Sequence, residues 1–232
     1  MDEIKFYGHT PPSVAGEPTP GRLIVIEGTD GVGRSTQIGM LQEWLEAEGY
    51  AVTVTGFRRS ELAATGINRA MRGNTLDALT LNLFYATDFW DRLEKNIVPA
   101  LRTGMVALVD RYIFSIIARA RVRGVPARWL NDVFEFAVVP DRVLYLDVDV
   151  EQLLPRVLAV RQLDHWESGE DFLRGPDLHD NFIRYQSALL QEFRTLAEEH
   201  NFVTIDARGS VGDVFEALQA EVREALKGMG DA

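Results

Sequence analysis

The stretch Gly28-Thr29-Asp30-Gly31-Val32-Gly33-Arg34-Ser35 follows the short apolar run Leu23-Ile24-Val25-Ile26, with Glu27 between them. Such a run without polar alternation is typical of a strand buried on both faces of a parallel sheet. Glycines at both ends of the following stretch let the backbone wrap closely around a phosphate, and a helix after it presents its positive N-terminal end to the anion. The stretch has the phosphate-loop pattern GxxxxGK[ST], with Arg34 at the lysine position.

The alternative interpretation is a tight connection between a strand and a helix that binds nothing, but the order strand, loop, helix favours the phosphate loop. Residues Ile38 to Leu45 have helical spacing, and Gly49 stands where a C-terminal glycine cap is expected. Four more strand-like runs alternate with helical stretches: Val52–Val54, Val106–Val109, Val143–Leu146 and Phe202–Ile205. This alternation predicts a three-layer α/β fold with a five-stranded parallel sheet. A capping box at Ser210–Asp213 predicts the start of the last helix.

Composition limits the classes of function. The chain has 232 residues, 46% of them hydrophobic, and a formal net charge of −11. This charge argues against a surface that binds duplex nucleic acid, although a local cluster of cations can still bind a small anionic ligand. The absence of cysteine excludes disulfides and thiolate chemistry. No apolar run is long enough to span a membrane, and the N-terminus lacks the pattern of a signal peptide, so we expect a cytoplasmic protein without a membrane partner.

The pattern divides the chain into a leader and one domain. Residues 1–21 are rich in proline (Pro11, Pro12, Pro18 and Pro20) and are expected to be an extended leader or linker, which Phe6 and Tyr7 can anchor. Residues 22–228 are expected to form the domain. Within it, residues 164–180 break the helical pattern and predict a mobile lid.

Acidic and basic residues follow the strand predicted at Val106–Val109. Asp110 and Arg111 come directly after it, at the edge where open α/β sheets bind ligands. A carboxylate at this position can hold Mg²⁺ or its water shell, and the Ser35 hydroxyl can meet the same ion. The sequence therefore predicts a site for a phosphate and Mg²⁺.

Together these residues resemble the thymidylate kinases, a family of P-loop nucleoside-monophosphate kinases. The resemblance runs from about Arg22 to Leu226. It is carried by four segments: IEGTDGVGRSTQ (residues 26–37), DRYIFS (110–115), PDRVLYLDVDVE (140–151) and IDARGSVGDV (205–214). It implies a P-loop NTPase-type fold, the cofactors ATP and Mg²⁺, transfer of the γ-phosphoryl group to thymidylate, and a homodimer to which residues 76–101 contribute.

The resemblance also implies roles for individual residues. The donor phosphates would be held by the loop and the helix start, namely Gly28, Gly31, Val32, Gly33, Arg34, Ser35 and Thr36. Adenine would lie against Ala207 and Arg208. Asp30 would orient the acceptor, Asp110 would assist Mg²⁺, and Arg111 would bind the acceptor phosphate. The acceptor would further contact Arg59, Tyr85, Phe89, Ser115, Arg119 and Arg121, and Arg156, Arg161 and Arg174 border the lid.

Departures from the family pattern concern the phosphate contacts. Phe89 stands where the family has an arginine, and Arg119, Arg121 and Arg123 stand where it has small or amide residues. These arginines can bind a more acidic acceptor, which predicts that thymidylate is a poor or non-preferred substrate, or they can form a solvated face.

Arg34 leaves two interpretations open. A guanidinium that reaches the γ-phosphate keeps binding but impairs alignment for transfer, whereas one that turns to solvent or pairs with Asp110 leaves a loop that only binds nucleotide. The alternative to a kinase is accordingly a weak or inactive relative that acts as a regulatory or interaction module.

Overall fold

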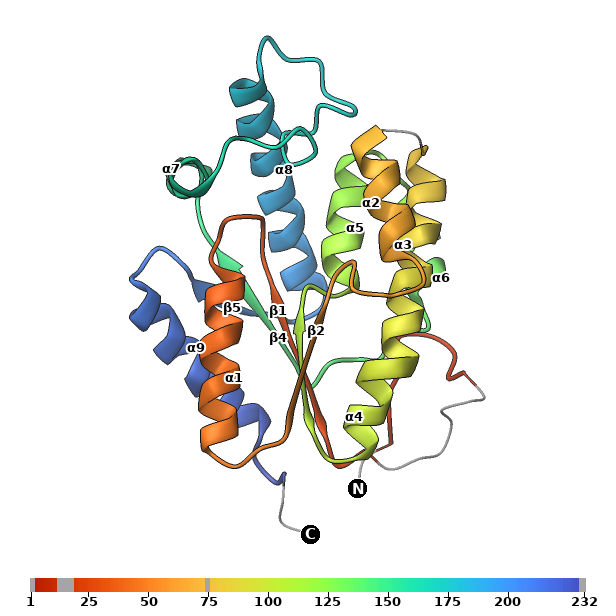
Figure 1. The fold of residues 1–232 in the computed structure, drawn as a ribbon, viewed down its shortest axis with the longest axis vertical. Helices are drawn as coiled ribbons and strands as arrows, with labels where there is room; N and C mark the ends of the chain where they lie inside the picture. Colours follow the sequence, from red (N-terminus) through yellow and green to blue (C-terminus); the bar gives the residue numbers. More distant parts are fainter. Residues whose placement is uncertain (1–2, 12–18, 74–75, 230–232) are drawn as a thin grey trace.

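The computed structural model describes residues 3–11, 19–73 and 76–229. Within these ranges five parallel strands form one sheet in the order β2-β3-β1-β4-β5 (Figure 1). The strands are β1 (Arg22–Glu27), β2 (Val52–Gly56), β3 (Val106–Asp110), β4 (Arg142–Asp147) and β5 (Val203–Asp206). The predicted strands and the predicted fold class are confirmed.

Alternate residues of the central strand β1 face two separate cores, because successive side chains of a strand point to opposite faces. Leu23 and Val25 pack on one face, and Ile24 and Ile26 pack on the other. All four are fully buried, which explains the apolar run in the sequence. The first core is shared with α3 (Ala78–Arg92), α4 (Val98–Arg102), α5 (Ile113–Val122) and α8 (Leu178–Glu199), and the second with α1 (Arg34–Ala47) and α9 (Val211–Ala225).

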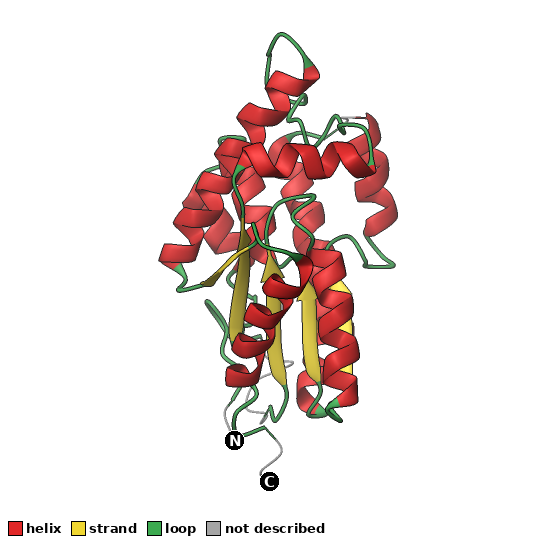
Figure 2. Ribbon diagram, turned by 90° about the vertical axis from the view of Figure 1, so that its left-hand side faces the viewer, coloured by secondary structure: helices red, strands yellow, loops and turns green. Residues whose placement is uncertain are grey.

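Further helices lie beyond the carboxyl ends of the strands and beside them (Figure 2). These are α2 (Ala64–Gly73), α6 (Ala127–Phe134) and α7 (Val150–Val160). Residues 76–101, which the resemblance assigns to a homodimer contact, lie mostly in α3, in a π-helical segment η2 (Leu93–Ile97) and in α4. No helix within the described residues is long and apolar enough to cross a membrane.

The predicted helix boundaries of α1 and α9 are confirmed. After α1 the chain turns at Gly49, which has a φ of 92°, a conformation that glycine adopts without steric cost. At α9 the Ser210 side chain accepts from the Asp213 N–H, and the Asp213 side chain accepts from the Ser210 N–H. Both caps satisfy backbone groups that the helix itself leaves unpaired.

The N-terminal residues contact the body of the domain. Phe6 forms an antiparallel bridge with Val138, and the Val139 N–H donates to the Lys5 carbonyl oxygen at 2.7 Å. The Tyr7 ring lies edge-on to Phe114, with centroids 6.1 Å apart. Phe6 and Tyr7 therefore make the anchoring contacts expected of them. Pro12 and Pro18 of the leader lie outside the described residues, and its boundary at residue 21 stays a prediction.

The segment between α7 and α8, within which a lid is predicted, is held by Arg123. The guanidinium of Arg123 binds both carboxylate oxygens of Asp171, at 2.7 and 2.9 Å. It also lies over the Trp166 ring, 4.4 Å from its centroid. Since α8 begins at Leu178, the last residues of the predicted lid are helical. That this segment moves as a lid stays a prediction.

Candidate functional site

The loop between β1 and α1 has the backbone of an anion cradle. Gly28, Gly31 and Gly33 have φ values of 146°, 81° and 106°, which side-chain-bearing residues rarely adopt. A Cβ on Gly31 would lie 2.5 Å from Val157 Cγ2, so this glycine is also required for packing against α7. A Cβ on Gly33 would meet nothing within 4 Å, so the loop is open on that side.

The start of α1 supplies N–H groups to that open side. The Gln37 N–H donates to the Gly33 carbonyl oxygen at 3.2 Å and is the first N–H to bond within the helix. The N–H groups of Arg34, Ser35 and Thr36 precede it, and helix geometry provides them with no acceptor. The side chains of Ser35 and Thr36 are exposed, whereas Val32 is buried beneath the loop. These groups can bind the phosphates of a nucleotide.

The side chain of Arg34 packs against the loop's own carbonyl oxygens and the end of β3. Its Nε is 2.9 Å from Asp110 Oδ1, and its Nη1 donates to the carbonyl oxygens of Gly28 and Thr29. The residue is only 8% exposed. Of the two positions that the sequence left open for this side chain, the structure shows the one paired with Asp110.

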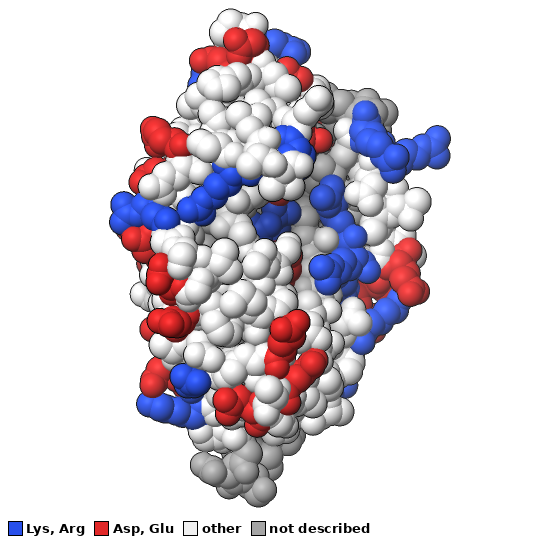
Figure 3. Space-filling model, turned by 60° about the vertical axis from the view of Figure 1, so that its left-hand side comes forward, with Lys and Arg blue, Asp and Glu red and all other residues white. Residues whose placement is uncertain are grey.

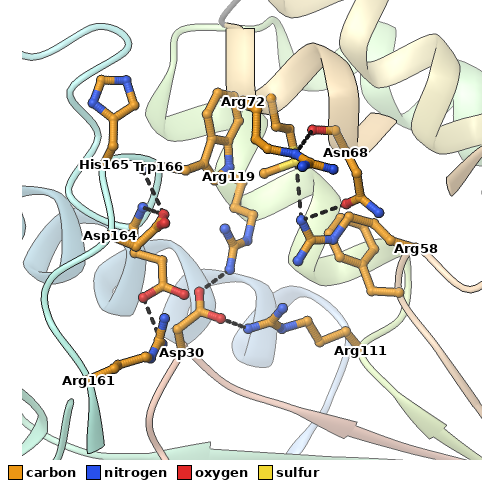
Figure 4. A pocket seen from close by; sticks show the side chains of 13 residues that line it. Asp30, Arg58, Asn68, Arg72, Arg111, Arg119, Arg161, Asp164, His165 and Trp166 are labelled. Atoms are coloured by element: carbon orange, nitrogen blue, oxygen red, sulfur yellow. Dashed lines mark hydrogen bonds and ion pairs between the residues drawn. The ribbon is translucent and has the colours of Figure 1, made fainter. Parts of the chain in front are cut away.

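Asp30 joins the loop to two arginines from other parts of the chain. Arg111 Nη2 donates to Oδ1 of Asp30, and Arg119 Nη2 donates to Oδ2 (Figure 4). Burial by itself would raise the pKa of Asp30, but the charges of Arg111, Arg119 and Arg34 outweigh it and hold this pKa well below its usual range. Asp30 is therefore an anion that keeps two guanidinium groups close together.

Arg111 owes its position to the sheet. In the pairing of β1 with β3, Ile26 stands opposite Asp110, and the Arg111 N–H donates to the Ile26 carbonyl oxygen at 3.1 Å. Arg111 has a φ of 68°, an unfavourable value for a residue with a side chain, and such strain is commonly found at functional sites. Burial and the charge of Arg34 lower the pKa of Arg111 to about 10. Arg111 therefore still carries a charge at neutral pH.

A cavity of about 680 Å³ opens beside Asp30. Its walls come from the loop after β2, from α2, from α5 and from the segment before α8. The lining residues are Asp30, Phe57, Arg58, Asn68, Met71, Arg72, Arg111, Arg119, Arg161, Asp164, His165, Trp166 and Glu167. Figure 3 shows Lys and Arg side chains gathered around a hollow in the upper part of the molecule. Arginine outnumbers the acids in this lining, so the cavity suits an anionic ligand.

The sequence analysis missed several residues of this cavity. Arg58 lines it, whereas the neighbouring Arg59, which was expected to bind the acceptor phosphate, is exposed and does not. Asn68 and Met71 come from α2 and carried no motif signal. The pair Arg58-Arg59 after a predicted strand was the available signal, but adjacent loop residues cannot be assigned to a cavity without the backbone conformation.

Two expected substrate contacts are corrected by the structure. Phe89 is fully buried, with its ring 4.8 Å from that of Tyr112, and does not line the cavity. Ser115 is also buried, and its hydroxyl donates to the Glu27 carboxylate at 2.6 Å. Both belong to the core of the domain: Phe89 packs on Tyr112 and Phe136, and Ser115 faces Glu27 of β1. The position of Phe89 therefore supplies no phosphate contact, and the arginines of the cavity come from other segments.

Arg121 lies outside the cavity as well. It pairs with Glu199 of α8 at 3.0 Å, whereas Arg119 from the same helix reaches Asp30. Residues two apart on a helix differ by about 200° in direction, so alternate arginines do not share one face. Tyr85 takes an intermediate position, since it is buried but donates its hydroxyl to Met71 Sδ, at the cavity wall, over 3.3 Å.

The expected adenine contacts lie after β5. The Ala207 N–H donates to the Asp147 carbonyl oxygen at 2.8 Å, and Arg156 Nη1 donates to the Ala207 carbonyl oxygen at 2.8 Å. Arg208 is exposed and pairs with Asp206 at 2.7 Å. Arg156 therefore organises this turn, and a role of Ala207 and Arg208 toward adenine stays a prediction.

Sites for a metal ion are limited by the available oxygen ligands. The described residues contain no group of three or more His, Asp or Glu side chains that could hold one. Ser35 and Asp110 alone would leave most positions around Mg²⁺ to water and to nucleotide phosphates, which is how this ion is commonly bound.

A parallel sheet with a glycine-rich loop between β1 and α1 and an arginine-lined cavity beside that loop define the P-loop class of nucleotide-binding proteins. The sequence matches the family model described as "Thymidylate kinase" over residues 26–218. This match covers most of the chain, so the chain belongs to the thymidylate kinase family.

Curated relatives agree with this assignment. The chain is 36% identical over 208 residues to the probable thymidylate kinase 2 of Saccharolobus solfataricus, with 89% of this chain and 95% of the relative covered. It is 30% identical over 216 residues to the probable thymidylate kinase of Pyrococcus abyssi, with 90% and 99% covered. It is 32% identical over 219 residues to the thymidylate kinase of Caldicellulosiruptor saccharolyticus, with 89% and 98% covered.

Proposed function

We propose that the protein is an ATP-dependent nucleoside-monophosphate kinase that converts ATP and dTMP to ADP and dTDP. The observation that carries this proposal is the position of Asp30, which belongs to the phosphate loop and also lines the arginine-rich cavity. The loop suits a donor nucleotide and the cavity suits a phosphate-bearing acceptor. Because the loop and the cavity meet at the carboxylate of Asp30, the γ-phosphate of the donor and the phosphate of the acceptor can approach each other there.

The donor side fits ATP and Mg²⁺. The loop is open at Gly33, and the first N–H groups of α1 face that opening. Ser35 and Asp110 would hold the metal together with nucleotide oxygens. When bound, ATP supplies the γ-phosphoryl group and Mg²⁺ neutralises its charge. The protein contributes position and charge, through the loop N–H groups and Arg34.

The acceptor side fits a nucleoside monophosphate. Arg111 and Arg119 already share an anion, Asp30, and can bind a phosphate with their remaining N–H groups. Arg58, from the loop after β2, adds a third guanidinium to the lining. Asp30, kept ionised by these arginines, would orient the acceptor phosphate for attack on the γ-phosphorus.

A regulatory or interaction module without catalysis is the second function that the sequence allowed. The ion pair between Arg34 and Asp110 supports this second function, because it occupies the two residues that would otherwise bind the γ-phosphate and Mg²⁺. Asp30, Asp110 and Arg111 are nevertheless assembled around the loop, and the curated relatives carry the names of kinases. The kinase is therefore the function that we favour.

An ADP-release assay with a panel of monophosphates tests the proposal. We expect Mg²⁺-dependent ADP release that is fastest with dTMP and slower with dUMP, UMP, CMP and AMP. Arg111→Ala should abolish most of it, because that side chain touches both Asp30 and the cavity. A wild-type protein that binds ATP but releases no ADP with any acceptor would contradict the kinase and support the module.

The assembly is also proposed rather than shown. A homodimer through α3 is supported by the exposed side chains of Leu79, Leu83 and Phe84 on that helix. Tyr85 and Phe89 of the same helix are buried within their own chain. The cytoplasmic location stays a prediction from the sequence.

A further inference from the structure

Asp88 of α3 is a fully buried carboxylate that holds the loop after β2. Its Oδ2 accepts from the Arg58 N–H at 3.2 Å, and its Oδ1 accepts from the Ser60 N–H at 3.1 Å. Arg92, one turn further along α3, donates its Nε to Oδ2 at 3.0 Å and is 1% exposed. A buried charge is costly unless it is paired and hydrogen-bonded, and Asp88 meets both conditions through Arg92 and the two N–H groups of the loop.

The loop that Asp88 holds has an unfavourable backbone. Arg58 has a φ of 60°, which a residue with a side chain rarely adopts. Such a conformation persists only where the surroundings enforce it. The hydrogen bonds to the N–H groups of Arg58 and Ser60 enforce it here, and the side chain of Arg58 consequently enters the cavity.

In the part of the chain that the structure describes, the side chain of Arg58 contacts only uncharged groups. Its Nη1 donates to Asn68 Oδ1 at 3.3 Å and to Met71 Sδ at 3.3 Å (Figure 4). Arg111 and Arg119, by contrast, share the carboxylate of Asp30. Like Arg72, whose Nε donates to the Asn68 carbonyl oxygen, Arg58 is thus not paired with a carboxylate in this lining and can bind an incoming anion.

We propose that Asp88 is a positioning residue for the phosphate of the acceptor, which it serves by holding Arg58. This inference rests on the proposed function, since it takes the ligand of the cavity to be a nucleoside monophosphate. In the family pattern this helix carries an arginine at the position of Phe89. In the structure α3 supplies a buried anion instead, and the adjoining loop supplies the cation.

A carboxylate is needed because both of its oxygens accept from backbone N–H groups. An amide has only one acceptor oxygen, so in Asp88→Asn one of the two N–H groups would face a donor. We expect the KM for dTMP to rise about tenfold, the size of one lost charge-assisted hydrogen bond, and the KM for ATP to change less than about twofold. Arg58→Ala should produce the same rise.

The decisive measurement is the combination of these changes. If Asp88 acts through Arg58, Asp88→Asn will raise the KM for dTMP in the wild-type background but not in the Arg58→Ala background. A merely structural role of Asp88 would lower the melting temperature in both backgrounds and leave no such difference in KM. Binding of dTMP to each variant, measured by calorimetry, checks the result without turnover.

Two further variants control for stability. Asp88→Asn leaves the Arg92 cation buried without its partner, so Asp88→Asn with Arg92→Gln is measured as well and should show the same rise in KM. Asp141→Asn is the matched control. Asp141 also accepts from a backbone N–H, that of Leu23 at 2.7 Å, but it lies at the opposite end of the sheet. The KM of Asp141→Asn for dTMP should therefore equal that of the wild type.

An unchanged KM for dTMP in both Asp88 variants, or additive effects of Asp88→Asn and Arg58→Ala, would overturn this inference. Wild-type turnover of dTMP would then leave the proposed function standing. A wild-type protein that neither binds nor phosphorylates dTMP would overturn both.

Discussion

Arg34 and Asp110 form an ion pair beneath the phosphate loop, with Nε of the arginine 2.9 Å from Oδ1 of the aspartate. The pair ties the start of α1 to the end of β3, and the carbonyl oxygens of Gly28 and Thr29 accept from the same guanidinium. To reach the γ-phosphate of a bound nucleotide, Arg34 has to leave these partners. Asp110 would be released to a metal ion by the same movement.

Arg34→Lys should therefore raise the rate of phosphoryl transfer more than it raises the affinity for ATP. A lysine ammonium is compact and fits between β- and γ-oxygens, and it makes fewer bonds to the carbonyl oxygens that now hold the guanidinium. Single-turnover transfer to dTMP, with the ATP dissociation constant measured beside it, separates the two effects. Restored affinity without transfer would show that the loop only binds nucleotide.

Gly33→Asp should abolish the thermal stabilisation by ATP and Mg²⁺. The substitution places a carboxylate at the opening of the loop, where it repels the phosphates. Gly49→Asp is the matched control, because Gly49 also has a positive φ and open space around its Cβ position but lies at the far end of α1. Both variants should lose about 1–2 kcal/mol of stability, and only Gly49→Asp should keep its ATP-dependent shift in melting temperature.

Arg119→Gln should raise the KM for dTMP about tenfold or more, since it removes one charged contact from the cavity. Arg121→Gln on the same helix should change this KM less than about twofold, because Arg121 pairs with Glu199 outside the cavity. Steady-state kinetics of both variants measures the difference. Equal effects would show that Arg119 does not contact the acceptor.

Asp30 should make stability depend on pH in the acid range. Its folded pKa lies below the unfolded value of about 3.9, so the ionised carboxylate stabilises the fold above that pH, and this contribution is lost as the pH falls through the folded pKa. Asp30→Asn should cost about 3 kcal/mol at pH 7. Urea unfolding measures the difference in the free energy of unfolding between the wild type and Asp30→Asn. This difference should become smaller below about pH 4. A difference that stays constant down to about pH 3 would contradict the ion pairs of Asp30.

Light scattering should show a homodimer at micromolar concentration. Leu83 is 50% exposed on α3, so Leu83→Asp should dissociate the dimer with little effect on the fold of the subunit. Leu158 on α7 is 51% exposed, and Leu158→Asp should leave the dimer intact. A wild-type protein that is monomeric at this concentration would exclude the assembly.

Several features were predictable because they depend on neighbours in the chain. The run Leu23–Ile26 reads as a buried strand, since both faces of β1 are covered. The glycines after it and the capping box at Ser210–Asp213 act through local backbone geometry. The order strand, loop, helix then places the phosphate loop at the carboxyl edge of the sheet.

By itself the sequence thus determined the parallel α/β fold, the phosphate loop and the placement of Asp110 and Arg111 at the end of β3. Only the tertiary structure decided which arginines face the cavity. Arg119 and Arg121 point to different sides of α5, and Arg58 rather than Arg59 enters the cavity because Asp88 of α3, 30 residues away, holds the backbone N–H of Arg58. Such directions depend on helix rotation and on contacts between distant segments, and no local pattern of residues encodes them.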